Sequence, residues 1–95
     1  MNLSVEEIRQ AALPILRRYG VTNAAVFGSA VKGQLRPESD IDILVRIGED
    51  ISLLGFVGLK LDLEQALSRR VDLVEYDMIK PRLRERILEE QETIL

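Results

Sequence analysis

The sequence predicts a small α/β (α+β) domain in which helices flank a short β-sheet of about three strands. Three observations support this prediction. Segments with helical spacing of apolar residues alternate with short strand-like runs, in the order α-β-α-β-α-β-α. Glycine and proline residues separate these segments. The chain has 95 residues, enough for one modest core, so we expect residues 1–95 to form a single domain.

The first predicted element is a helix that begins after Ser4. Ser4 and Glu7 have the spacing of a capping box, in which each side chain bonds to the backbone N–H of the other residue. Apolar residues follow at helical intervals as far as Tyr19, and Gly20 provides a stop. Pro14 interrupts this pattern because proline lacks the N–H that a helix interior uses. We therefore expect either a kink at Pro14 or a helix that starts later than Ser4.

The next predicted segments are short. Residues 24–27 form an apolar run that ends at a glycine, which predicts a first strand. Residues 29–32 could form one helical turn, and the polar residues 34–39 predict a loop. Residues 41–47 are rich in isoleucine and valine and predict a second strand.

The C-terminal half predicts a long helix over residues 51–67 and a third strand over residues 71–76. A last helix is expected from Arg82 to about Ile94, with Pro81 in the favoured first position.

The apolar face of the predicted helix 51–67 is wider than one side of a three-stranded sheet requires. Two interpretations stay open. The helix is either fully covered within the core, or its face is an interface for a homo- or hetero-oligomer. Gly55 and Gly58 lack the partner residues of a phosphate-binding loop, so they indicate close packing of this helix.

Composition excludes several classes of function. The chain contains no cysteine and no histidine, which excludes disulfides, thiolate zinc sites and Ser-His-Asp triads. Catalysis would have to use carboxylates, hydroxyls, lysine or arginine. If a metal ion takes part, the oxygen ligands among these groups favour magnesium. The net charge is −3, so direct binding of long nucleic acids is not expected. No apolar run is long enough to cross a membrane and no signal-peptide pattern is present, which favours a cytoplasmic protein.

Three aspartates form a candidate metal site. Asp40 and Asp42 open the second predicted strand and share one face, because strand residues two apart point the same way. Asp72 lies in the third predicted strand. If these strands are neighbours, the three carboxylates can hold one or two Mg²⁺ ions, and Asp72 could accept the proton of an attacking hydroxyl. An Asp-x-Asp pair alone is more often a turn or a solvated face, so the interpretation depends on the whole combination.

A second pattern predicts a nucleotide-binding turn. Gly28 directly follows the first predicted strand, where a glycine lets the backbone approach a phosphate closely. The Ser29 hydroxyl and the backbone N–H groups beside it could then face the anion. Lys32, one turn further, could reach the same phosphates.

The sequence Gly28-Ser29, ten residues, then Asp40-Ile41-Asp42 resembles the signature of the DNA polymerase beta-like nucleotidyltransferase superfamily. The short length and the segment 27–45 resemble its minimal nucleotidyltransferase family, over residues 4 to about 90. Residues 70–74 are similar to that family's third-carboxylate strand. The resemblance implies a mixed sheet flanked by helices, metal ligands at Asp40, Asp42 and Asp72, and nucleotide binding at Gly28 and Ser29.

The resemblance also implies a magnesium-dependent enzyme that uses ATP. Family members of this size are often encoded beside a HEPN-domain toxin and act as its antitoxin, and some transfer AMP to a tyrosine of the toxin. We therefore expect an antitoxin that transfers AMP to a hydroxyl of a HEPN-domain partner. Two alternatives stay open: a non-catalytic antitoxin that neutralises a HEPN RNase by complex formation, and a nucleotide sensor or accessory subunit of a larger transferase.

Overall fold

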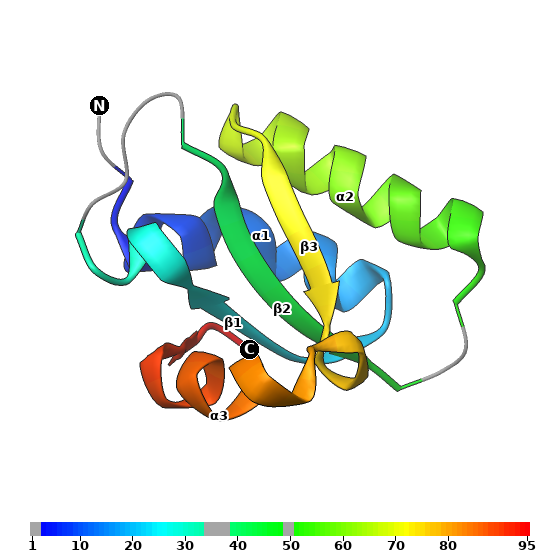
Figure 1. Cartoon of the computed structure of the whole chain (residues 1–95). Coiled ribbons are helices and arrows are strands. Elements are labelled where there is room, and N and C mark those ends of the chain that lie inside the picture. Colours follow the sequence, from blue (N-terminus) through cyan, green and yellow to red (C-terminus); the bar gives the residue numbers. More distant parts are fainter. Residues whose placement is uncertain (1–2, 34–38, 49–50) are drawn as a thin grey trace.

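The structure, a computed structural model, describes residues 3–33, 39–48 and 51–95. Most of the polar loop predicted over 34–39 lies outside these residues. Within them the chain forms three α-helices and one four-stranded sheet, which confirms the predicted fold class and adds a strand to the expected three (Figure 1). The elements are α1 (Val5–Arg18), β1 (Val21–Phe27), the 3₁₀ turn η1 (Gly28–Ala30), β2 (Ile41–Ile47), α2 (Leu53–Leu67), β3 (Val71–Glu75), the 3₁₀ turn η2 (Tyr76–Met78), α3 (Pro81–Glu90) and β4 (Glu92–Thr93).

The sheet is mixed and has the strand order β3-β2-β1-β4. β1 runs antiparallel to both β2 and β4, whereas β2 runs parallel to β3. A parallel pair requires a long crossover, which α2 supplies here. The crossover brings the beginnings of β2 and β3 to the same end of the sheet.

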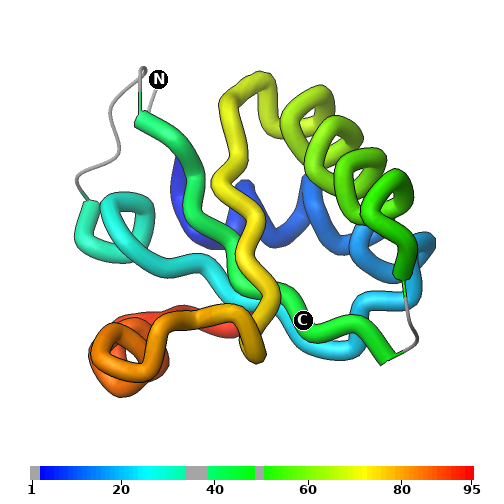
Figure 2. The backbone as a smooth tube through the Cα atoms, turned by 45° about the vertical axis from the view of Figure 1, so that its right-hand side comes forward, coloured from blue at the N-terminus to red at the C-terminus, as the bar shows by residue number. Residues whose placement is uncertain are grey.

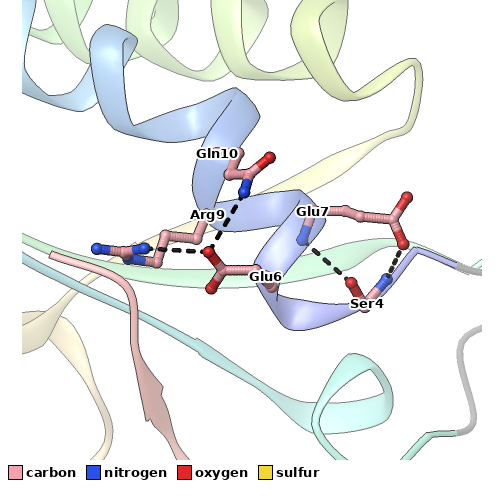
Figure 3. Close-up of polar contacts among 5 residues, drawn as sticks. All are labelled: Ser4, Glu6, Glu7, Arg9 and Gln10. Atoms are coloured by element: carbon pink, nitrogen blue, oxygen red, sulfur yellow. Dashed lines mark hydrogen bonds and ion pairs between the residues drawn. The ribbon is translucent and has the colours of Figure 1, made fainter.

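The predicted capping box fixes the start of α1 (Figure 3). Ser4 Oγ accepts a hydrogen bond from the Glu7 N–H at 3.1 Å, and the Glu7 carboxylate accepts one from the Ser4 N–H at 3.2 Å. In the same turn, the Glu6 carboxylate accepts from the side chains of Arg9 at 3.2 Å and Gln10 at 3.4 Å. The two bonds between Ser4 and Glu7 satisfy backbone donors that a helix start leaves without partners.

Pro14 lies inside α1, which is continuous from Val5 to Arg18, so the alternative of a later start is wrong. The residue is exposed and cannot donate the hydrogen bond that a helical N–H would make to the Gln10 carbonyl. Pro14→Ala is expected to restore this bond and to raise the free energy of unfolding by about 1–3 kcal/mol. Urea denaturation of both proteins measures the difference, and an unchanged or lower value would contradict the expectation.

The main hydrophobic core lies between the sheet and the helices α1 and α2 (Figure 1). On β2, the alternate residues Ile41, Ile43 and Val45 point into this core and have no exposed surface. α3 lies on the other side of the sheet from α1 (Figure 2). On that side Ala25 and Leu44 are also completely buried, so both faces of the central strands are packed.

Glycine allows α2 to approach α1 closely at one point. A Cβ atom at Gly58 would come within 3.3 Å of the Tyr19 hydroxyl, and that hydroxyl donates a hydrogen bond to Asp62 at 2.6 Å. The prediction of close helix packing is therefore confirmed for Gly58. Gly55 differs, because its nearest neighbour is Ile51 of the preceding turn.

The apolar face of α2 is only partly covered, so the interpretation of a fully covered core helix is wrong. The helix begins at Leu53 and not at residue 51, because Ser52 caps it by accepting a hydrogen bond from Gly55 N–H at 3.0 Å. Apolar side chains of α2 that face solvent are Leu53, Leu54, Val57 and Leu61, exposed by 80%, 83%, 41% and 56%.

No helix in the described ranges is long and apolar enough to span a membrane.

The predicted extension of the last helix to Ile94 is wrong. α3 ends at Glu90, and the chain then turns back to form β4 beside β1. Ile94 is 2% exposed, and its N–H donates to the Ala24 carbonyl at 2.9 Å. Burial of this side chain and the pairing with β1 outweigh its place in the helical pattern.

Two strand boundaries also differ from the predictions. β1 begins at Val21 instead of residue 24, and a β-bulge between Val21 and Asn23 lets the polar residues at its start face solvent. β3 ends at Glu75, one residue before its predicted end, because Tyr76 begins the turn η2.

Candidate functional site

Asp42 and Asp72 stand opposite each other on the parallel strands β2 and β3. Both point away from the main core, since the residues that flank Asp42, Ile41 and Ile43, are buried in it. Asp40 comes one residue before β2 and is exposed. The two strands are neighbours, as the candidate site requires.

The carboxyl group of Asp42 is less acidic than usual. Burial raises the pKa of Asp42 from its ordinary value of 3.8 to about 6, assisted by the negative charges of Asp72 and Asp40 and by a hydrogen bond with Asp72. Among the ion pairs of the described residues, none involves these three aspartates. Within the described residues, these mutually repelling carboxylates therefore lie together without an ion pair to a lysine or arginine.

Stability should depend on pH through Asp42. Because folding raises this pKa from 3.8 to about 6, the protonated form stabilises the fold, and that contribution is lost as pH rises through about 6. In the absence of metal, Asp42→Asn should therefore be more stable than the wild type by about 1–2 kcal/mol at pH 7, after allowance for partial exposure, and equally stable near pH 4. Urea denaturation in EDTA at both pH values tests this. An advantage of the same size at pH 4 and pH 7 would assign it to another cause.

The donor set fits a divalent cation that prefers oxygen ligands. Carboxylates are the usual protein ligands of Mg²⁺, and a cation among three of them offsets their repulsion. As the side chains stand, no group of three or more carboxylates in the described ranges is already arranged to hold a metal ion. Asp40 and Asp72 are exposed, so their side chains can change rotamer to complete a site around Asp42.

Gly28 brings the turn after β1 directly against Asp42. The antiparallel register pairs Phe27 with Asp42, so Gly28 follows at the level of the carboxylates. Its φ is +73°, and a Cβ atom at this position would overlap the Asp42 carboxylate. The turn can therefore take this path only with a residue that lacks a side chain.

The turn η1 presents backbone donors beside the aspartates. The Gly28 carbonyl accepts hydrogen bonds from the N–H groups of Val31 and Lys32, both at 3.2 Å, whereas the Ser29 N–H at the start of the turn has no acceptor within the described residues. The arrangement leaves the N–H and the hydroxyl of Ser29 to bind an anion.

Lys32 forms an ion pair that the sequence did not indicate. Its Nζ lies 3.5 Å from a carboxylate oxygen of Glu90 at the end of α3. Glu90 also pairs with Arg86 at 3.5 Å. No sequence signal connects Glu90 with Lys32, because only the tertiary packing of α3 brings them together.

Comparison with known proteins agrees with this geometry. Residues 10–95 match the family described as "Polymerase beta, Nucleotidyltransferase". A candidate protein adenylyltransferase of Methanocaldococcus jannaschii is 43% identical over 93 residues, which cover 98% of this chain and 100% of the relative. Protein adenylyltransferase MntA of Thermococcus cleftensis is 42% identical over 87 residues, or 90% of this chain and 88% of the relative.

Solved structures show the same fold. One described as a candidate minimal nucleotidyltransferase matches with a TM-score of 0.81 and 40% identity and covers 95% of each chain. A chain from the complex of a tri-AMPylated Shewanella oneidensis HEPN toxin with an MNT antitoxin matches with a TM-score of 0.73, covering 95% of this chain and 71% of that one; at 21% identity this likeness shows the fold alone. The chain is therefore a nucleotidyltransferase and belongs to the polymerase beta nucleotidyltransferase family, in its minimal form.

Proposed function

We propose that this nucleotidyltransferase is a protein adenylyltransferase that uses ATP and magnesium to attach AMP to a hydroxyl of a partner protein. The observation that supports this best is the register that sets Asp42 opposite Asp72, with Gly28 against the same carboxylate. One small region thus combines oxygen ligands for a cation with donors for a phosphate. The relatives named as protein adenylyltransferases support the choice of a protein acceptor.

In this proposal the metal ligands are Asp40, Asp42 and Asp72. Magnesium bound there would offset the charge of the triphosphate and of the carboxylates. The turn at Gly28 and Ser29, with the Lys32 ammonium, would bind the β- and γ-phosphates, which leaves the α-phosphate near the aspartates.

The chemical step breaks a phosphoanhydride bond of ATP and forms a phosphoester bond to the acceptor. The acceptor oxygen bonds to the α-phosphorus, the bond from that phosphorus to the bridging oxygen breaks, and pyrophosphate leaves. The proton of the hydroxyl needs an acceptor, and the exposed Asp72 carboxylate is a group that an incoming side chain can reach.

The acceptor in this proposal is a tyrosine of a HEPN-domain toxin, and transfer of AMP neutralises that toxin. A fold shared with an MNT antitoxin in complex with an AMPylated HEPN toxin supports this partner. The exposed apolar residues of α2 support a second candidate, in which the chain neutralises the toxin through complex formation without catalysis.

One experiment separates the two candidates. The protein is incubated with ATP, magnesium and the HEPN-domain protein, and intact mass spectrometry follows the mass of that protein. We expect added AMP with the wild type and with Glu89→Gln, an exposed carboxylate of α3 that serves as control. The double variant Asp40→Ala, Asp42→Ala should lose both transfer and neutralisation. Neutralisation that persists in this variant would favour the non-catalytic antitoxin, and no transfer by the wild type would refute the enzyme.

A further inference from the structure

The outer edge of β3 carries backbone groups that have no partner among the described residues. β3 is the last strand in the sheet order. On its inner side, the Arg70 carbonyl accepts a hydrogen bond from the Ile41 N–H of β2 at 2.9 Å. Backbone groups alternate between the two sides of a strand, so the even-numbered residues of β3 bond to β2 and the odd-numbered ones point outward.

The backbone at the start of this edge already has a hydrogen-bond partner. The Val71 N–H points outward and donates to the Glu64 carboxylate of α2 at 2.9 Å. The next outward residues, Leu73 and Glu75, have no backbone partner on that side in the part of the chain that the structure describes. An exposed edge of this kind can accept another strand.

An apolar groove lies beside the open part of the edge. Its cavity volume is about 660 Å³, and it runs between the beginning of α2 and the end of β3 with η2. Leu53 and Met78 line it and are 80% and 77% exposed, while Phe56 and Leu73 also contribute. Exposure this large for apolar side chains indicates an unfilled contact surface.

The groove is acidic as well as apolar. Glu75 and Asp77 line it, and neither forms an ion pair with any residue that the structure describes. The contact between them is a hydrogen bond from the Asp77 N–H to the Glu75 carboxylate at 2.9 Å. A second copy of this chain, paired through the same edge, is a poor occupant, because β3 carries two carboxylates and no lysine or arginine that could offset Glu75 and Asp77. A segment with apolar and cationic side chains is complementary.

The edge leads from the groove to the candidate active site. Asp72 precedes Glu75 by three positions, which is about 10 Å along a strand. Asp72 points to the face that carries Asp42, whereas Leu73 and Glu75 point to the face that carries α2. A strand added here would thus touch the groove with one side chain and the aspartates with another.

We propose that the acceptor protein docks by adding an extended segment to the outer edge of β3, with an apolar side chain in the groove, a lysine or arginine against Glu75 and Asp77, and the acceptor hydroxyl opposite Asp72. This inference rests on the proposed function, for which it supplies the acceptor-binding surface. Opposed residues of paired strands share a face. The apolar anchor therefore lies at an odd spacing from the acceptor residue, and three positions match the distance from Asp72 to the groove.

Synthetic nine-residue peptides with a single tyrosine test the pattern. One set places leucine three positions from the tyrosine with a neighbouring lysine, and matched sets replace leucine by aspartate or lysine by glutamate. AMP incorporation from labelled ATP is measured for each peptide and for tyramine, a small acceptor that has no backbone to pair. We expect kcat/KM for the leucine–lysine set to be at least about tenfold higher than for either matched set. Each matched set lacks one buried apolar contact or one charge pair, and a loss of that size is usual for either.

Variants locate the contact on this chain. Leu53→Asp should raise KM for the leucine–lysine peptide about tenfold and leave tyramine and ATP kinetics unchanged. Leu61→Asp is the matched control, because Leu61 is also an exposed leucine of α2 but does not line the groove. Asp77→Lys should reverse the preference for lysine over glutamate.

The outcomes distinguish failure of the docking proposal from failure of the proposed enzyme activity. If tyramine is labelled and the peptides are labelled equally, or not at all, docking at the β3 edge is overturned and the enzyme stands. Equal effects of Leu53→Asp and Leu61→Asp would also overturn it. If neither tyramine nor any protein is labelled, the proposed function itself fails.

Discussion

Asp42→Asn is expected to lower the rate of AMP transfer by about 10²–10³-fold, the usual cost of losing one group that stabilises developing charge. Asparagine has nearly the same shape as aspartate but lacks the negative charge that would hold the proposed divalent cation. Asp42 is the most central of the three aspartates, because its carboxylate meets Asp72 across the strand pair and Gly28 from the turn. Initial rates with labelled ATP and the HEPN-domain protein, at saturating ATP and magnesium, would measure the loss.

The stability of the same variant provides the internal control. Asp42→Asn should be at least as stable as the wild type in the absence of metal, so unfolding would not account for lost activity. Glu89→Gln makes the same chemical change on the exposed surface of α3 and should retain full activity. A rate for Asp42→Asn within tenfold of the wild type would remove Asp42 from the proposed metal site.

Gly28→Ala is expected to lower AMP transfer by at least about 100-fold, because displacement of a reacting group by about 1 Å has effects of that size. The added methyl group would occupy the position of the Asp42 carboxylate, so either the turn or the aspartate must move. The positive φ of Gly28 adds about 1–2 kcal/mol of backbone strain for alanine. Activity assays and urea denaturation would measure the two effects separately.

Gly33→Ala separates strain from displacement. Gly33 has a φ of +69°, close to that of Gly28, but a Cβ atom there would meet nothing within 4 Å. We expect a similar loss of stability in this variant with activity close to that of the wild type. Equal loss of activity in both variants would mean that backbone strain, and not the contact with Asp42, explains the effect.

Much of the candidate site could be read from local patterns. The two-residue spacing of Asp40 and Asp42 placed them at one strand start, and the glycine after the first strand marked a close backbone approach. The contact itself, a glycine whose missing side chain leaves room for Asp42, depends on the register of β1 against β2. Register is a tertiary property that no single segment determines.

The elements that prediction missed depend on contacts between distant segments. β4 has two residues and exists because residues near the end of the chain pair with β1. The sequence of α2 likewise does not determine which of its apolar side chains are buried. Leu59 and Leu63 are buried while Leu53 and Leu54 are exposed, although all four are leucines of one helix, because α1 and β3 pack against only part of it.

The crossover through α2 affects how often β3 separates from β2. β1 and β2 are consecutive antiparallel strands, whereas β3 joins β2 only after α2 has crossed over, and pairings of that kind form late and open early. Repulsion between Asp42 and Asp72 weakens the same pair. Amide hydrogens on the inner side of β3 should therefore exchange faster than those of β1. Occupation of the site by nucleotide and magnesium should slow that exchange along the whole of β3, so that backbone opening rates would report ligand binding from residues that the ligand does not touch.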